Sequence, residues 1–172
     1  MKQQHLSKHN LSARREQRAE RREMKPVILI ADDDDAVRTM LGRFLESENY
    51  NVVFARNGMQ ALSEFLIMPY DLLLLDLEMP GQNGWEVFGI LSRLHPMMPI
   101  IIMTALPNQQ ERAELAGVDA LLEKPLDLAL LLQTIREALA RPQPVRVARQ
   151  AEPIDTASPF VSAHANELTM EI

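Results

Sequence analysis

The sequence predicts an α/β domain with a five-stranded parallel sheet and helices on both of its faces. Short apolar runs recur along residues 27–140, and segments with apolar residues at helical spacing separate them. Short apolar runs bounded by turn residues are typical of parallel strands that are buried on both faces. Five repeats of strand and helix therefore favour a doubly wound sheet.

The predicted strands are short and largely apolar. They are expected at Val27–Ala31, Asn51–Ala55, Asp71–Leu75, Pro99–Met103 and Ala120–Leu122. The helices between and after them are expected at residues 36–47, after the Asn57-Gly58 turn, at 84–94, at about 108–117 and at 127–140. Asn108 and Asp127 are the expected N-caps of the last two helices, because their side chains can accept hydrogen bonds from the first turn.

Length and composition bound the class of protein. A chain of 172 residues with 47% hydrophobic residues is long enough for one packed domain. It has no cysteine, which excludes disulfides and thiolate metal sites. No apolar run approaches the ~18 residues that a membrane span needs, and residues 1–25 contain no apolar signal region. We therefore expect a globular protein of the cytoplasm.

Charge divides the chain into three parts. Residues 1–25 hold eight Lys or Arg and three Glu, whereas residues 26–140 hold seven Lys or Arg and seventeen Asp or Glu. Residues 141–172 are nearly neutral and contain four prolines. We predict a basic N-terminal extension over 1–25 that is helical or disordered, one domain over 26–141, and a mostly disordered tail over 142–172.

Polar residues stand at the carboxyl ends of four predicted strands. Asp32 and Asp33 follow the first strand, Asp76 the third, Thr104 the fourth, and Lys124 the fifth. In an open α/β sheet, ligands bind beyond these ends. Three carboxylates, a hydroxyl and an ammonium are therefore expected to meet at one mouth, where they can hold a divalent metal and a phosphoryl group.

The acidic run after the first strand has two readings. Adjacent carboxylates repel each other unless a cation is present, and a site made only of oxygen ligands favours Mg²⁺. Aspartates are also common at helix N-termini, where they cap the first turn. Capping accounts for Asp34 and Asp35 better than for Asp32 and Asp33, because the latter two directly follow the buried strand.

Asp76 ends a run of four leucines and is either a deeply placed structural acid or a nucleophile. An aspartate can accept a phosphoryl group as an acyl phosphate. Pro125 holds Lys124 in an extended conformation, which can aim its ammonium across the mouth towards Asp76. The hydroxyl of Thr104 can donate to a phosphoryl oxygen, although threonine is also simply a good strand residue.

Four segments, ILIADDD, LLLLDLEMPGQNGWE, IIIMTA and AGVDALLEKPL, together resemble the response-regulator receiver domains of two-component signalling. The resemblance covers residues 26–140. It implies a flavodoxin-like (βα)₅ fold with strand order 2-1-3-4-5. It also implies that Asp76 accepts a phosphoryl group from a histidine kinase or a histidine phosphotransfer protein, and that the domain catalyses only its own phosphorylation and dephosphorylation.

The resemblance also implies the ligand set of the site. Mg²⁺ would be held by the carboxylates of Asp33 and Asp76, by Asp32 through water, and by the backbone carbonyl of Glu78. Thr104 and Lys124 would hold phosphoryl oxygens. Residues 142–172 are too few for a DNA-binding output domain, so we expect a stand-alone receiver that signals through protein–protein contacts, with no direct binding to nucleic acid or membranes.

Two departures from the family pattern concern the output. Receivers commonly carry an aromatic residue three positions before the lysine, where this chain has Leu121. The interval from Thr104 to Lys124 is about two residues shorter than in the family. We therefore hypothesise that phosphorylation causes a small loop shift and not an aromatic flip.

Two alternative functions remain open. A receiver fold that is never phosphorylated could act only as a docking module, and Leu121 and the short fourth helix favour it weakly. Haloacid-dehalogenase-type phosphohydrolases carry a DxDx[TV] motif, which Asp33-x-Asp35-x-Val37 matches. That family needs a further acidic pair after the lysine, where only Asp127 follows closely. The phosphohydrolase reading also gives no role to Asp76.

Several surfaces are candidates for partners. The basic extension can contact nucleic acid, anionic lipid or the acidic domain, but without aromatic residues or a DNA-binding motif we expect a solvated arm. The apolar stretch Leu126–Leu132 belongs either to the core or to a homodimer formed through the fourth and fifth helices. Met79 and Trp85 belong either to a partner surface or to the packing beside the site.

Overall fold

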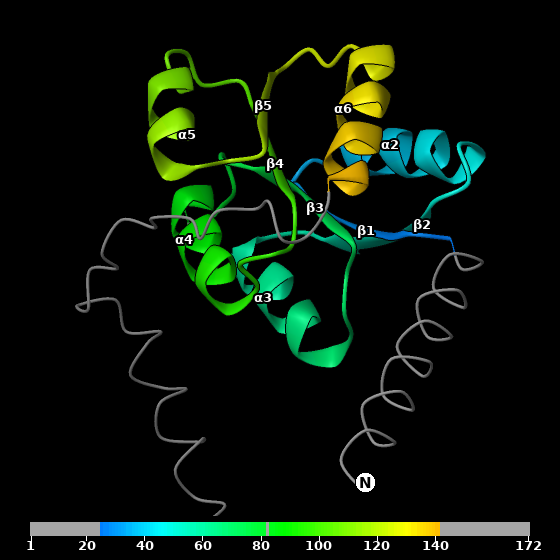
Figure 1. Ribbon diagram of the computed structural model, residues 1–172, viewed down its shortest axis with the longest axis horizontal. Coiled ribbons are helices and arrows are strands. Elements are labelled where there is room, and N and C mark those ends of the chain that lie inside the picture. Colours follow the sequence, from blue (N-terminus) through cyan, green and yellow to red (C-terminus); the bar gives the residue numbers. More distant parts are fainter. Residues whose placement is uncertain (1–24, 82, 142–172) are drawn as a thin grey trace, which may run out of the picture.

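The computed structural model describes residues 25–81 and 83–141, which alternate strand and helix throughout (Figure 1). The elements are β1 (Val27–Ala31), α2 (Asp35–Ser47), β2 (Asn51–Ala55), α3 (Gly58–Ile67), β3 (Leu72–Asp76), α4 (Gly84–Leu94), β4 (Ile100–Thr104), α5 (Gln110–Ala116), β5 (Ala120–Glu123) and α6 (Leu128–Ala140). Almost all of the predicted N-terminal extension and the whole predicted C-terminal tail lie outside the described residues. None of the described helices is long and apolar enough to cross a membrane.

The strands form one parallel sheet in the order β2-β1-β3-β4-β5, as predicted. β3 lies between β1 and β4, so the chain turns back across the sheet after β2 and then continues outward on the other side of β1. The carboxyl ends of β1 and β3 are therefore direct neighbours, with Ala31 paired to Leu75. This register places the residues that follow β1 beside the end of β3.

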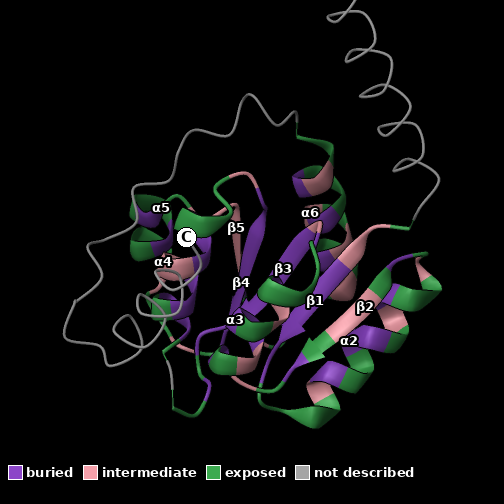
Figure 2. Ribbon diagram, turned by 90° about the horizontal axis from the view of Figure 1, so that it is seen from below, coloured by how far each residue is buried: buried purple, intermediate pink, exposed green. Residues whose placement is uncertain are grey.

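The core consists of two clusters, one on each face of the sheet. α2 and α6 pack on one face through residues such as Leu41, Leu45 and Leu131. α3, α4 and α5 pack on the other, through residues such as Phe65 and Leu91. β3 and β4 are buried along their whole length (purple in Figure 2) because helices cover both of their faces. This explains why their sequences are continuous apolar runs.

Several predicted boundaries differ from the observed ones by one residue. β3 and β4 each begin and end one residue later than predicted, so Asp76 and Thr104 are the last residues of their strands. Asp71 lies just before β3, where its Oδ2 accepts a hydrogen bond from the backbone N of Val27 at 2.8 Å. That bond joins the start of β1 to the residue that precedes β3.

The predicted cap of the fourth helix was wrong. Asn108 has a left-handed φ of 59°, and Gln109 occupies the N-cap position without a side-chain hydrogen bond to the helix. The helix ends at Ala116, and Gly117 after it adopts a left-handed conformation, as expected of a C-cap glycine. Asp127 caps the last helix as predicted, accepting from the backbone N of the second and third residues.

Candidate functional site

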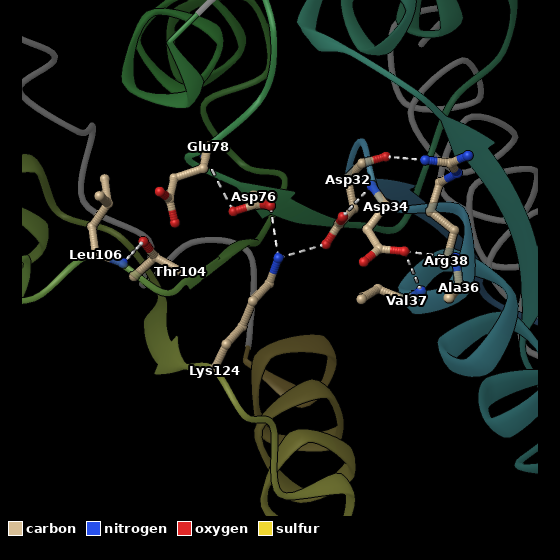
Figure 3. Close-up of polar contacts among 10 residues, drawn as sticks. All are labelled: Asp32, Asp34, Ala36, Val37, Arg38, Asp76, Glu78, Thr104, Leu106 and Lys124. Atoms are coloured by element: carbon tan, nitrogen blue, oxygen red, sulfur yellow. Dashed lines mark hydrogen bonds and ion pairs between the residues drawn. The ribbon is translucent and has the colours of Figure 1, made fainter.

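The predicted polar residues meet at the carboxyl edge of the sheet, around the end of β3 (Figure 3). Asp32 directly follows β1, Asp76 ends β3, Thr104 ends β4, and Lys124 directly follows β5. Asp32 and Thr104 have no exposed surface, and Asp76 is only 2% exposed. Buried polar side chains need hydrogen-bond or ionic partners.

Lys124 joins two of the carboxylates. Its Nζ lies 2.7 Å from Oδ2 of Asp76 and 2.9 Å from Oδ2 of Asp32. Its backbone N donates to the carbonyl of Thr104 at 2.8 Å, and its peptide bond to Pro125 is cis. The ammonium of Lys124 thus extends across the mouth to Asp76, as predicted.

Burial dominates the electrostatics of Asp76. It raises the pKa of this carboxyl above its ordinary value, although hydrogen bonds from Lys124 and from the backbone N of Glu78 partly offset it. For Lys124, burial alone would lower the pKa. Its hydrogen bonds and charge interactions with Asp76 and Asp32 outweigh burial and raise the pKa, so the ammonium stays protonated. One ammonium therefore faces two acidic side chains.

Every polar group of Asp32 has a partner. Its backbone N donates to the carbonyl of Ala55 at 3.2 Å, and its carbonyl accepts from Nη1 of Arg38. Its Oδ1 accepts from the backbone N of Asp34 at 2.9 Å, while its Oδ2 binds Lys124. Asp32 is thereby fixed in place, and its carboxylate is already engaged on both oxygens.

Asp33 differs from Asp32 in both exposure and contacts. It is exposed, and within residues 25–81 and 83–141 no hydrogen bond or ion pair engages its carboxylate. Carboxylate oxygens of Asp32, Asp33 and Asp76 nevertheless all lie within 4.8 Å of one another. A cluster of three carboxylates without nitrogen or sulfur donors suits a hard divalent cation such as Mg²⁺.

Asp34 and Asp35 serve the start of α2, as the capping reading predicts. Oδ1 of Asp34 accepts from the backbone N of Ala36 at 2.8 Å and of Val37 at 3.3 Å. Asp35 lies in the first turn, and its largely exposed carboxylate pairs with Nη2 of Arg38 at 2.7 Å. These two acids therefore shape the loop that carries Asp32 and Asp33.

Glu78 and Thr104 border the pocket. The backbone N of Glu78 donates to Oδ1 of Asp76 at 3.1 Å, while its side chain is exposed. The buried hydroxyl oxygen of Thr104 accepts from the backbone N of Leu106 at 3.0 Å. In the described part of the chain no hydrogen bond joins this hydroxyl to Asp76 or to the ammonium of Lys124, so its proton is available to another acceptor.

Two residues that shape the site were not predicted. Gly84 begins α4 so close to β3 that a Cβ there would lie 2.4 Å from the carbonyl oxygen of Asp76. Arg38 is only 4% exposed and holds the loop after β1. A signal for Arg38 exists in the sequence, because helical spacing places residue 38 on the same face as Leu41 and Leu45.

The candidate partner residues are mostly packing residues. Met79 and Trp85 are each 7% exposed and belong to the core cluster beneath α3 and α4. The indole Nε1 of Trp85 donates to Oε1 of Gln109 at 3.1 Å, and the guanidinium of Arg112 lies 4.6 Å from its ring centroid. Leu131 is buried, whereas Leu130 is half exposed; the packing of α6 thus accounts for most of the apolar stretch 126–132.

Leu121 lies three positions before Lys124, where receivers commonly carry an aromatic residue. It is half-buried on β5, pairs in register with Ile102, and packs against the cluster that includes α4 and α5. The helix before this strand, α5, has only seven residues. The position that is commonly aromatic in receivers is thus filled by the aliphatic side chain of Leu121, which packs against the core.

Comparisons with known proteins agree with this geometry. The model of the response regulator receiver domain family matches residues 28–136. Among curated proteins, response regulator RR06 of Streptococcus pneumoniae is 33% identical over 66% of this chain and 53% of its own length. Response regulator MprA of Mycobacterium avium is 40% identical over 68% of this chain and 52% of its own length. The matched part of the chain thus spans about half the length of these relatives.

Solved structures show the same fold. A CheY-like response regulator receiver domain protein from Methanospirillum hungatei superposes with a TM-score of 0.64 at 31% identity, over 68% of this chain and 94% of that one. Response regulator TrrA of Thermotoga maritima, solved in complex with Mg²⁺ and BeF, gives a TM-score of 0.62 at 32% identity over 67% and 99%.

Proposed function

Because the chain belongs to the response regulator receiver domain family, we propose that Asp76 accepts a phosphoryl group from a phosphohistidine on a histidine kinase or a phosphotransfer protein. The observation that carries this proposal is the contact of Lys124 with Asp76 and Asp32 inside a cluster of three carboxylates. The fold does not require two buried carboxylates at this edge of the sheet, and together with Lys124 they provide a nucleophile and a neutralising charge.

The reaction is a phosphoryl transfer between two protein side chains. A carboxylate oxygen of Asp76 forms a bond to phosphorus while the P–N bond of the phosphohistidine breaks, and the imidazole nitrogen keeps the electron pair. Catalysis of such a step consists mostly of positioning and charge stabilisation. The ammonium of Lys124, already 2.7 Å from Asp76, is placed to bind an oxygen of the transferring group.

Mg²⁺ fits the donor set of this site. Asp33, which has no other partner among the described residues, and Asp76 are proposed as direct ligands. Asp32 is proposed to act through water, as the resemblance to receiver domains implies. The backbone carbonyl of Glu78 completes the proposed set. When bound, the ion neutralises negative charge on the phosphoryl group.

Thr104 is proposed to report the modification. Its hydroxyl has a proton to donate to a phosphoryl oxygen, and its oxygen holds the backbone N of Leu106. If the hydroxyl turns towards the phosphoryl group, the loop after β4 moves with it. With Leu121 in place of an aromatic residue, we propose a small shift of this loop as the response, read by a protein partner of a receiver that occupies residues 26–141.

The phosphohydrolase alternative finds less support. Its motif would use Asp33 and Asp35, but the carboxylate of Asp35 pairs with Arg38 on the side of α2. The centre of the polar cluster is Asp76, which that motif leaves without a role. A docking module without phosphorylation differs from our proposal in one respect only, the reactivity of Asp76.

Phosphate labelling tests these functions against one another. The protein is incubated with acetyl phosphate and Mg²⁺, and intact mass spectrometry counts phosphoryl adducts. We expect one Mg²⁺-dependent adduct on the wild type and none on Asp76→Asn. A variant Asp71→Asn, changed at an acid that binds Val27 at the opposite end of β3, should still be labelled. Loss of labelling in Asp33→Asn with full labelling of Asp76→Asn would favour the hydrolase, and no adduct on the wild type would favour the docking module.

A further inference from the structure

Arg38 is a buried cation that the proposed chemistry does not use. It lies on the face of α2 that carries Leu41 and Leu45, and only 4% of its surface is exposed. An apolar residue would suit this face, because a charge is costly to bury without partners. The contacts of Arg38 therefore indicate what the charge does.

The guanidinium of Arg38 holds two points of one loop. Nη1 donates to the backbone carbonyl of Asp32, and Nη2 binds the carboxylate of Asp35 at 2.7 Å. These two residues bracket the loop between β1 and α2. In Figure 3 the side chain reaches the carbonyl of Asp32 from the side away from Lys124. The planar fork of an arginine suits such a two-point contact, and the ammonium of a lysine does not.

Between Asp32 and Asp35 lies Asp33, the exposed member of the carboxylate cluster. Its carboxylate has no hydrogen bond or ion pair to any other described residue, yet it lies within 4.8 Å of those of Asp32 and Asp76. With no side-chain partner, its place is set by the backbone on either side of it. That backbone is fixed by Arg38 and by the bond from Asp34 to Asp32.

We propose that Arg38 is a positioning residue for the metal site: it holds the loop so that Asp33 faces Asp76 before a cation arrives. This inference rests on the proposed function, because it deepens the role assigned to Asp33. Residues that orient metal ligands typically change metal affinity by about 10- to 100-fold when they are replaced. Since Asp32 keeps its bonds to Ala55, Asp34 and Lys124, we expect a loss of about 10-fold.

A purely electrostatic role for Arg38 predicts the opposite sign. A cation near an anionic pocket repels Mg²⁺, so its removal would strengthen binding of the metal. A positioning role predicts that removal weakens binding. The direction of the change therefore separates the two roles.

The test measures the dissociation constant of Mg²⁺ by amide NMR titration, with no phosphoryl donor present. Arg38→Met removes the fork and fills the site with an apolar chain, and Arg38→Lys keeps the charge and removes the two-point contact. Arg43→Met, on an exposed position of the same helix, is the matched control. We expect weaker Mg²⁺ binding in both Arg38 variants and wild-type binding in the control.

Unchanged or tighter binding of Mg²⁺ in a folded Arg38→Met protein would overturn the inference and leave the proposed function intact. Should Arg38→Met not fold, Arg38→Lys decides, and wild-type affinity in that variant would overturn the inference equally. A wild type that binds no Mg²⁺ at all would overturn both this inference and the proposed metal ligands.

Discussion

The ammonium of Lys124 and the carboxylate of Asp76 are 48 residues apart in sequence and 2.7 Å apart in the structure. The pair forms because β5 ends beside β4, which ends beside β3, so that both residues face the same mouth. Oδ2 of Asp32 lies 2.9 Å from the same Nζ. The ammonium of Lys124, which follows β5, thus joins the end of β3 to the first residue after β1.

Replacement of Lys124 by Met should destabilise the fold in the absence of metal. The change leaves Asp32 and Asp76 buried and without their counter-charge. Removing one partner of a buried ion pair costs about 3–5 kcal/mol, and partial exposure of Lys124 reduces the expected loss to roughly 1–3 kcal/mol. Urea denaturation in EDTA measures it. Arg56→Met, at an exposed position, should change the free energy of unfolding little; an equal loss there would contradict the account.

Asp76→Asn should stabilise the protein at neutral pH in EDTA. Burial raises the pKa of Asp76 above its ordinary value of about 4. A raised carboxyl pKa means that the folded state binds the proton more tightly than the unfolded state. The stability that this proton provides is complete below the unfolded pKa and is lost as pH rises through the folded pKa. Asn cannot ionise, so it avoids this loss.

The pH dependence itself is the measurement for Asp76. Urea denaturation of wild type and Asp76→Asn is compared from pH 4 upward in EDTA. The advantage of the variant should grow as pH rises and then level off, and Mg²⁺ should reduce it by stabilising the wild type. A stability advantage of Asp76→Asn that is constant with pH would show that burial does not raise the pKa of Asp76.

Gly84→Ala should disturb the end of β3. A Cβ at this position would lie 2.4 Å from the carbonyl oxygen of Asp76 and 2.6 Å from the Cα of Leu77. Both contacts are backbone, so the start of α4 must move away from β3. We expect a destabilisation of about 1–3 kcal/mol, together with slower phosphorylation.

The matched control for Gly84 is on the same helix. A Cβ at Gly89 would meet nothing within 4 Å, so Gly89→Ala should be neutral or stabilise by up to ~1 kcal/mol through helix propensity. Thermal unfolding and acetyl phosphate labelling are measured on both variants. Equal effects of the two substitutions would argue against the close approach of α4 to Asp76.

Thr104→Val should leave phosphorylation in place and abolish the loop response. Valine has nearly the same shape, but it cannot hold the backbone N of Leu106 or donate to a phosphoryl oxygen. Amide NMR of the protein with Mg²⁺ and beryllium fluoride, a mimic of the phosphoryl group, should show shifts around residues 104–109 in the wild type. These shifts should be absent in the variant. A large movement of α5 in the wild type would contradict the small loop shift that Leu121 implies.

The positions of the site residues could be predicted because they follow local rules. Apolar runs mark the buried strands, and the carboxyl ends of parallel strands share one edge. The sequence therefore predicts that Asp32, Asp76, Thr104 and Lys124 lie close together. The different roles within the acidic run also follow from position, because Asp34 and Asp35 lie at the start of α2 and Asp32 and Asp33 directly follow β1.

Other features depend on tertiary contacts that no local pattern records. The need for glycine at position 84 comes from the backbone of β3, which lies against the start of α4. Asparagine is a common N-cap residue, but Asn108 has a left-handed conformation and lies one residue before the N-cap position, which Gln109 occupies. The two-point contact of Arg38 requires the loop geometry of residues 32–35, although its place on the buried face of α2 follows from spacing.

Chemical trapping of the acyl phosphate tests the central claim most directly. The protein is phosphorylated with acetyl phosphate and Mg²⁺ and reduced with borohydride, which converts a phosphorylated aspartate into homoserine. Peptide mass spectrometry then identifies the converted residue. The account predicts homoserine at position 76 and nowhere else. Homoserine at position 33, or none at any aspartate of a protein that carries the phosphoryl group, would contradict it.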